Sequence, residues 1–137
     1  MSRFAKEIAE FLDAAGVGVY STPDPTQRTI FTGKLPVGVA EGLNITESIG
    51  PAPHAYTDQQ YPILDFTARS DAPDRAHLLL EQVWGILDRR NGYTLTNWYV
   101  YNSSALSDIV DLDEDRESGK LYRLSVQFIC RNLNNVS

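Results

Sequence analysis

Residues 121–131 read LYRLSVQFICR, and apolar and polar side chains alternate along them almost without interruption. This period of two predicts a strand that turns one face to a core and the other to water. Strands with one wet face are typical of antiparallel sheets. The side chains expected to face the core are Tyr122, Leu124, Val126, Phe128 and Cys130.

The clearest helix is predicted earlier in the chain, at residues 72–90. Asp71 is placed to cap its first turn, and Pro73 fits a position where no amide donor is needed. Asn91-Gly92 is expected to end the helix, since glycine readily takes the left-handed conformation found after helices. The predicted buried stripe consists of Ala76, Leu79, Leu80, Val83, Ile86 and Leu87.

A second amphipathic helix is predicted at residues 3–15, capped by Ser2 and ended by Gly16. Alternation and turn residues divide the rest of the chain into short strands and polar loops. Together they predict a single α+β domain over residues 1–137, a mostly antiparallel sheet covered on one face by two amphipathic helices. Strands are expected at 17–21, 29–35, 43–49, 61–69 and 94–101, and loops at 22–26, 50–60 and 102–119.

Composition restricts the class of protein. The chain has 137 residues, 42% of them hydrophobic, which fits one globular domain. A formal net charge of −6 argues against nucleic acid as a tightly held ligand, because phosphate binding needs clustered basic side chains. No apolar run approaches the roughly 18 residues of a membrane span, and the N-terminus has no apolar signal core, so we expect a soluble cytosolic protein. The single cysteine, Cys130, is expected to be a buried, inert thiol.

The residues that catalysis needs are scarce. The two histidines are His54, in a proline-rich loop, and His77, among polar positions of the predicted helix, where a solvated role is expected. The Gly-x-Ser-x-Gly turn of hydrolases is missing, and Gly119-Lys120 lacks the preceding glycine of a phosphate-binding loop. We therefore expect no catalytic site and no cofactor. A deep polar pocket that gathered His54, Asp65 and Arg69 would instead favour an enzyme or a small-ligand module.

An acidic segment, DLDEDRE, occupies residues 111–117. Asp111, Asp113 and Asp115 match the first, third and fifth positions of a calcium loop. However, Arg116 stands where that loop needs glycine, and Tyr122 stands where it needs a bidentate glutamate. We therefore expect no metal. The segment is either solvated charge or a contact for basic residues of a neighbouring subunit, and both interpretations stay open.

Aromatic residues give a second candidate surface. The predicted strand 94–101 carries Trp98, Tyr99 and Tyr101, and neighbouring side chains of a strand point to opposite faces, so some of these rings face away from the core. Outward rings either form subunit interfaces or are covered by loops. The candidate interface residues are Asp111, Asp113, Glu114, Asp115, Arg116, Arg69, Arg28, Tyr99 and Tyr101.

Several short motifs follow one another along the chain. It opens with Phe4-Ala5-x-x-Ile8-Ala9-x-x-Leu12, and an exposed strand with Phe31 and then Leu35-Pro36 follows. A strand ending in Arg69 leads into a helix with Ala76, Val83 and Leu87, and the pattern closes with Asp113-Glu114-x-Arg116 and Tyr122-x-Leu124. In this order and spacing, over nearly the whole chain, the sequence resembles the tail terminator proteins of long-tailed bacteriophages, also called minor capsid or tail-completion proteins. It departs from them at residues 105–110, where a Gln-Pro or similar pair is usual.

The resemblance implies a structural virion protein that forms a homohexameric ring. Such a ring sits on the last ring of tail-tube subunits, stops tube growth and offers a surface to the head connector. The implied partners are further copies of the chain, the tail tube protein and a head-closure or connector protein, with DNA passing through the ring without tight binding. The implied location is the tail and neck of the virion, after assembly in the bacterial cytoplasm. The alternative within this class is another neck or tube subunit.

Overall fold

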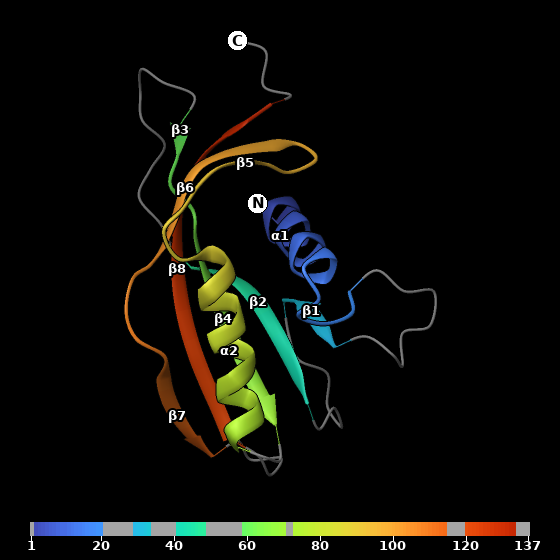
Figure 1. The fold of residues 1–137 in the computed structure, drawn as a ribbon, viewed down its shortest axis with the longest axis vertical. Coiled ribbons are helices and arrows are strands. Elements are labelled where there is room, and N and C mark those ends of the chain that lie inside the picture. The colour runs from blue at the N-terminus through green and yellow to red at the C-terminus, as the bar shows by residue number, and fades with distance from the viewer. Residues whose placement is uncertain are drawn as a thin grey trace.

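The computed structural model describes residues 2–20, 29–33, 41–48, 59–70, 73–114 and 120–133. These described residues form two helices and eight strands in one domain (Figure 1). The strands form one sheet in the order β1-β2-β4-β8-β6-β5, and β3 and β7 also pair with β8. The elements are α1 (Ser2–Ala14), β1 (Ile30–Thr32), β2 (Gly42–Ser48), β3 (Gln59–Gln60), β4 (Ile63–Ser70), α2 (Pro73–Leu87), β5 (Arg90–Thr94), β6 (Trp98–Ala105), β7 (Val110–Glu114) and β8 (Lys120–Asn132).

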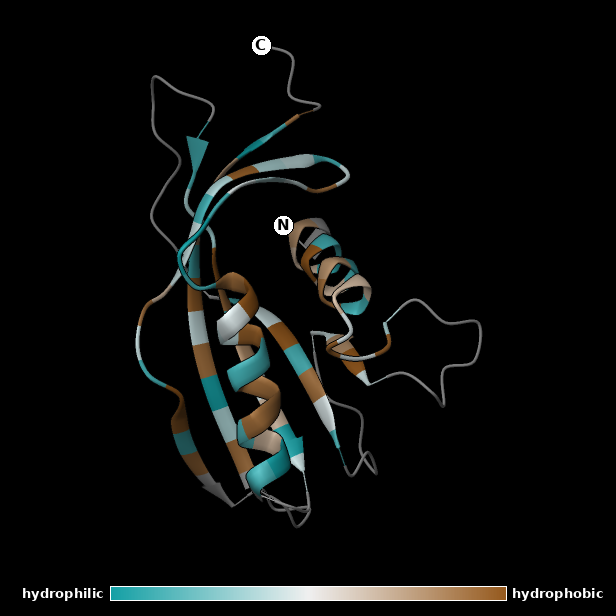
Figure 2. Ribbon diagram, in the orientation of Figure 1, coloured by the Kyte–Doolittle hydropathy of each residue, from teal (hydrophilic) through white to brown (hydrophobic). Residues whose placement is uncertain are grey.

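Strand β8 is the centre of the sheet. Strand β4 pairs antiparallel with it from Ile63, opposite Gln127, to Ser70, opposite Lys120. Along its other edge β8 pairs first with β7 and then with β6. Figure 2 shows hydrophobic and hydrophilic bands that alternate along this strand. The side chains of Leu124, Val126, Phe128 and Cys130 are fully buried, as the sequence predicts, whereas Tyr122, the fifth residue predicted for this face, is only partly buried against the core.

Both helices lie on the same face of the sheet (Figure 1). Helix α1 packs over β1 and β2, and α2 packs over β4 and β8. The fold is therefore the predicted one, an α+β domain with a mostly antiparallel sheet; only β1 and β2, among the described strands, run parallel. Phe4 joins the layers, because its ring meets Trp98 edge-on at 5.3 Å and Phe128 at 5.1 Å between centroids. Neither of the described helices is long and apolar enough to cross a membrane.

The end of α2 corrects the predicted boundary. The helix ends at Leu87 and not at residue 90, and β5 already begins at Arg90. Arg89 takes the left-handed conformation, with φ 56°, that the sequence assigned to Gly92. Gly92, with φ 57°, lies inside β5, where the Oη atom of Tyr99 would come within 3.1 Å of an added Cβ. The glycine is thus a place of close packing within the sheet and not a helix stop.

The region after α2 is a hairpin, and not the single strand 94–101 that we predicted. Strands β5 and β6 pair antiparallel, and the Leu95 amide donates to the Trp98 carbonyl across the turn at 2.7 Å. A bulge follows, because Val100 pairs with Cys130 while Asn102 pairs with Ile129, which leaves Tyr101 as the extra residue. The inward face therefore changes from even-numbered to odd-numbered residues along β6.

Further differences concern short polar segments. The predicted loop 102–119 contains the end of β6 and all of β7, because β8 supplies the hydrogen-bonding partners that a local pattern cannot reveal. Residues 17–20 form no strand, although the Val19 carbonyl accepts bonds from the amides of Thr29 and Ile30. Of the predicted strand 29–35, residues 30–32 form β1, and residues 34–35 lie outside the described residues. Gln59–Gln60 pair with β8 where a loop was predicted. The predicted loop 22–26 and the cap Asp71 lie outside the described residues.

Candidate functional site

The acidic segment lies at one end of β8. Strand β7 places Asp111 opposite Tyr122 and Glu114 opposite Lys120, with an irregular register between them. Asp111 is exposed, and Asp113 lies between the two on the same strand. The first part of the segment is therefore strand and not loop. Asp115, Arg116 and Arg28 lie outside the described residues. Within the described part of the chain, no group of three or more His, Cys, Asp or Glu side chains is arranged to hold a metal ion.

Arg69 lies at the same end of β8 as the acidic strand, across the other edge. It pairs with Leu121, and its side chain is only 6% exposed, although the alternation of β4 predicted an outward position. A nearly buried guanidinium offers a neighbouring subunit little surface to contact. Asp65, on the same face of β4, accepts a hydrogen bond from the Ser125 hydroxyl at 2.6 Å. His54, the third member of the alternative polar site, lies outside the described residues.

The two tyrosines lie at the opposite end of β8. Tyr99 pairs with Arg131, and its ring meets that of Tyr101 edge-on at 5.0 Å. Tyr101 is 38% exposed, and Tyr99 is half-buried. The structure thus separates the candidate interface residues into two surfaces, which we call the tyrosine end (Tyr99, Tyr101 and Arg131) and the acidic end (Asp108, Asp111 and the rest of β7).

The tyrosine end rests on a buried contact with α1. Glu7 is 6% exposed, and its two carboxylate oxygens accept from the backbone amide of Asn97 at 2.7 Å and from the Asn97 side-chain amide at 2.8 Å. These residues are 90 positions apart in the sequence, so no local pattern predicts the contact. Beside it, Phe11 stacks on Tyr93 at 5.2 Å, and the Arg90 guanidinium lies over both rings.

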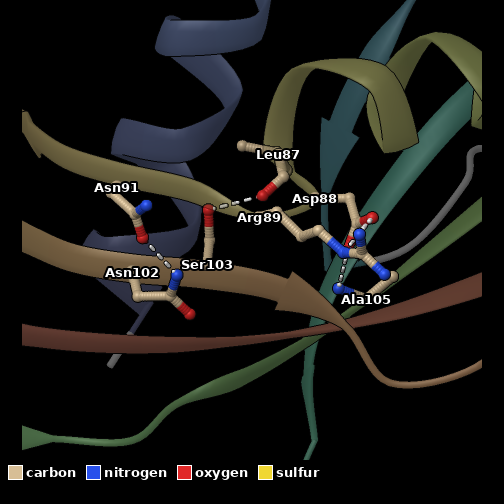
Figure 3. Close-up of polar contacts among 7 residues, drawn as sticks. All are labelled: Leu87, Asp88, Arg89, Asn91, Asn102, Ser103 and Ala105. Carbon is tan, nitrogen blue, oxygen red and sulfur yellow. Dashed lines mark hydrogen bonds and ion pairs between the residues drawn. The ribbon is translucent and has the colours of Figure 1, made fainter.

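A second set of bonds fixes the C-terminal end of α2 to β6 (Figure 3). The Ser103 hydroxyl donates to the Leu87 carbonyl at 2.7 Å, and the Tyr93 hydroxyl donates to Ser103 at 2.9 Å. The Ala105 amide donates to the Asp88 carboxylate at 2.9 Å. These partners satisfy a helix carbonyl that would otherwise need a local cap. Burial raises the pKa of Tyr93 to about 12, so its hydroxyl remains a donor at neutral pH.

A groove of about 450 Å³ lies between α2 and the connection from β6 to β7. Its walls are His77, Glu81, Trp84, Asp108 and Ile109. The first three recur at helical spacing on one side of α2, whereas the last two come from the connection between β6 and β7. His77 is half-exposed, with its Nδ1 atom 2.6 Å from the Glu81 carboxylate. Its ring also meets Tyr122 edge-on at 5.3 Å. Sequence reasoning assigned His77 to the surface and missed the groove, although the spacing of the helix residues was visible.

The single cysteine, Cys130, is a free thiol on β8. The thiol is buried, as the sequence predicted, and burial raises its pKa to about 12, which leaves it protonated and unreactive at neutral pH. A scan of protein-family models and a search of curated protein sequences both found no match to this chain. The resemblance to tail terminator proteins therefore stays a prediction from the sequence.

Proposed function

We propose that the protein is a structural subunit of a bacteriophage tail, which assembles into a ring at the end of the tail tube and joins it to the head connector. The observation that carries this proposal is the separation of the tyrosine end from the acidic end along β8. A head-to-tail ring that also binds other proteins needs several unlike surfaces on each subunit. A half-exposed tyrosine pair and an acidic strand with an exposed Asp111 are unlike in this sense, and tyrosine is enriched at interfaces.

The order of elements supports the same proposal. An N-terminal helix, a group of strands, a second helix and a C-terminal group of strands follow one another as in the resemblance described above. Among the described elements, both helices lie on one face, and the sheet edges at β1 and β5 and the opposite face are candidate places for subunit contacts. The net charge of −6 fits a ring through which DNA passes without being held.

The purified protein and a phage that lacks its gene test this proposal together. The protein, mixed with tail tubes and examined by negative-stain electron microscopy, is expected to form one ring of subunits at the tube end. The mutant phage is expected to make tails of uncontrolled length that do not join heads. Open filaments of the protein alone would instead identify a tube subunit, and tails of normal length joined to heads would exclude a terminator.

A further inference from the structure

The groove beside α2 contains the features that recognise an organic cation. Two carboxylates, Glu81 and Asp108, stand in its walls together with the indole of Trp84. A guanidinium or ammonium group binds favourably over an indole face and pairs with carboxylates. Glu81 and Trp84 lie on α2, whereas Asp108 lies in the connection between Ala105, the last residue of β6, and Val110, the first residue of β7.

One carboxylate of the groove is already held in place. The Nδ1 atom of His77 lies 2.6 Å from the Glu81 carboxylate, and the His77 ring packs edge-on against Tyr122 of β8. A carboxylate that is ordered before binding loses less side-chain entropy when a cation arrives. The Glu81 side chain nevertheless remains 55% exposed, so it can still accept a further donor.

The arginines on α2 and directly after it are engaged elsewhere. The Nη2 atom of Arg75 lies 3.0 Å from the Glu41 carboxylate. Arg89 lies beyond the end of the helix, with its Nε atom 3.9 Å from the Asp88 carboxylate (Figure 3). The Arg90 guanidinium lies over two aromatic rings beside α1. These three arginines therefore do not supply a cation to the groove.

Exposed apolar side chains close in the sequence to the wall residues favour a cation that is carried by another protein. Leu106 and Val110 flank the wall residues Asp108 and Ile109, and their side chains are 49% and 41% exposed. Leu78, which directly follows His77 in α2, is also exposed. Exposed apolar side chains around a polar centre are typical of protein interaction sites, whereas a free small cation would leave them in water.

We propose that this groove binds an arginine side chain of a partner protein, with the guanidinium between Glu81, Asp108 and the Trp84 ring and with apolar residues of the partner on Leu106 and Val110. Arginine binding in this groove does not require ring formation, so a result that excluded a role in the phage tail would leave this site untouched. Arginine suits it better than lysine, since its planar group stacks on an indole while it donates to two carboxylates.

The two tryptophans allow a direct test by NMR. Trp84 lines the groove, while Trp98 is 3% exposed inside the core, so the indole N–H signal of Trp98 is an internal reference. The ¹⁵N-labelled protein is titrated with N-acetyl-arginine amide and with the uncharged analogue N-acetyl-citrulline amide. A saturable shift of the Trp84 signal with the arginine compound alone is the expected result. Equal shifts with both compounds, or none, would overturn the proposal.

Matched variants locate the cation. Glu81→Gln and Asp108→Asn keep the shape of the side chain and remove its charge, and each is expected to weaken binding about two- to fivefold, the range for an exposed ion pair. Asp74→Asn is the control, because Asp74 is exposed in the first turn of the same helix, outside the groove walls. An equal weakening by Asp74→Asn would mean that only the general negative charge of the surface attracts the probe.

A peptide distinguishes a partner protein from a free cation. Acetyl-Leu-Arg-Leu-amide carries the same guanidinium with apolar residues on both sides, and acetyl-Ser-Arg-Ser-amide is its polar counterpart. The leucine peptide is expected to bind more tightly, and Leu106→Ser is expected to remove that advantage while the affinity for N-acetyl-arginine amide stays the same. Equal affinities of the two peptides for the unaltered protein would reduce the groove to a site for free cations and would contradict a protein partner.

Discussion

The two ends of β8 are attached to the molecule in different ways. At the tyrosine end, the β5–β6 hairpin is fixed to α1 through Glu7 and Asn97 and to α2 through Ser103, in addition to its ladder with β8. At the acidic end, β7 is short, its register with β8 is irregular, and the connection before it borders the groove beside α2. A surface that must fit a partner accurately benefits from firm attachment, as at the tyrosine end. Adaptable recognition is more often found on loosely attached segments that a rigid scaffold carries, as at the acidic end.

The largest expected effect concerns the core that both ends share. Leu80→Ala and Phe128→Ala each remove a fully buried side chain between a helix and the sheet. Each is expected to lower the free energy of unfolding by about 2–5 kcal/mol, through lost burial and the cavity that remains. Urea denaturation measures the loss. Leu78→Ala, an exposed position on the same helix, is the control, and losses no larger than its own at both buried positions would mean that the two faces are inverted.

The next effect separates the ends. Glu7→Gln replaces one of the two acceptors that face Asn97 with a donor, so a buried hydrogen bond is lost. We expect a loss of about 1.5–3 kcal/mol in unfolding free energy, the range for a hydrogen bond to a charged group. Faster amide exchange is expected at residues 95–97, with β7 unaffected. Glu10→Gln, on the exposed side of α1, is the control; a Glu7 variant that behaved like it would show that the hairpin is not held by this contact.

A smaller effect appears in alkaline solution. Burial raises the pKa of Tyr93 from 10.0 to about 12 and that of the Cys130 thiol from 9.0 to about 12. The folded protein therefore keeps protons that the unfolded chain has already released, so stability is complete below about pH 9 and falls as the pH rises toward 12. Of this loss, Tyr93 is expected to account for about 1 kcal/mol by pH 11. Urea midpoints measured across this range test it, and a profile that Tyr93→Phe leaves as steep would contradict the contribution of Tyr93.

The smallest effect on stability is expected at the acidic end. Asp113→Lys combined with Asp115→Lys should change unfolding free energy by no more than about 0.5 kcal/mol, because surface ion pairs contribute about 0–1 kcal/mol each. The same reversal is expected to weaken ring formation or head joining, since each contact recurs in every subunit of the ring. Plaque counts after complementation of a phage lacking the gene give the measurement. Normal counts with a complete neck would show that the segment is only solvated charge.

The candidate interface residues differ in how well the sequence alone predicted their exposure. The outward position of Tyr101 could be predicted from the alternation of strand side chains, and the exposure of Asp111 from the acidic composition of its segment. The burial of Arg69 was not predictable, because the alternation of β4 assigns it to a wet face. The groove beside α2 was not predictable either, because Trp84 and Asp108 meet only when the connection between β6 and β7 passes the helix.

The sequence by itself determined the two helices, the central strand β8 and the apolar residues that form the core, because these depend on periods of two and 3.6 residues that repeat within one segment. Tertiary structure alone decided where α2 ends, how β6 changes its inward face at Tyr101, and which strands pair with the polar segments around it. Those features depend on partners far away in the chain: the Leu87 carbonyl needs Ser103, and the hairpin needs Glu7. A hydrogen bond between distant residues leaves no periodic pattern in either segment. Its contribution can therefore be recognised only in the folded structure, where the two partners meet.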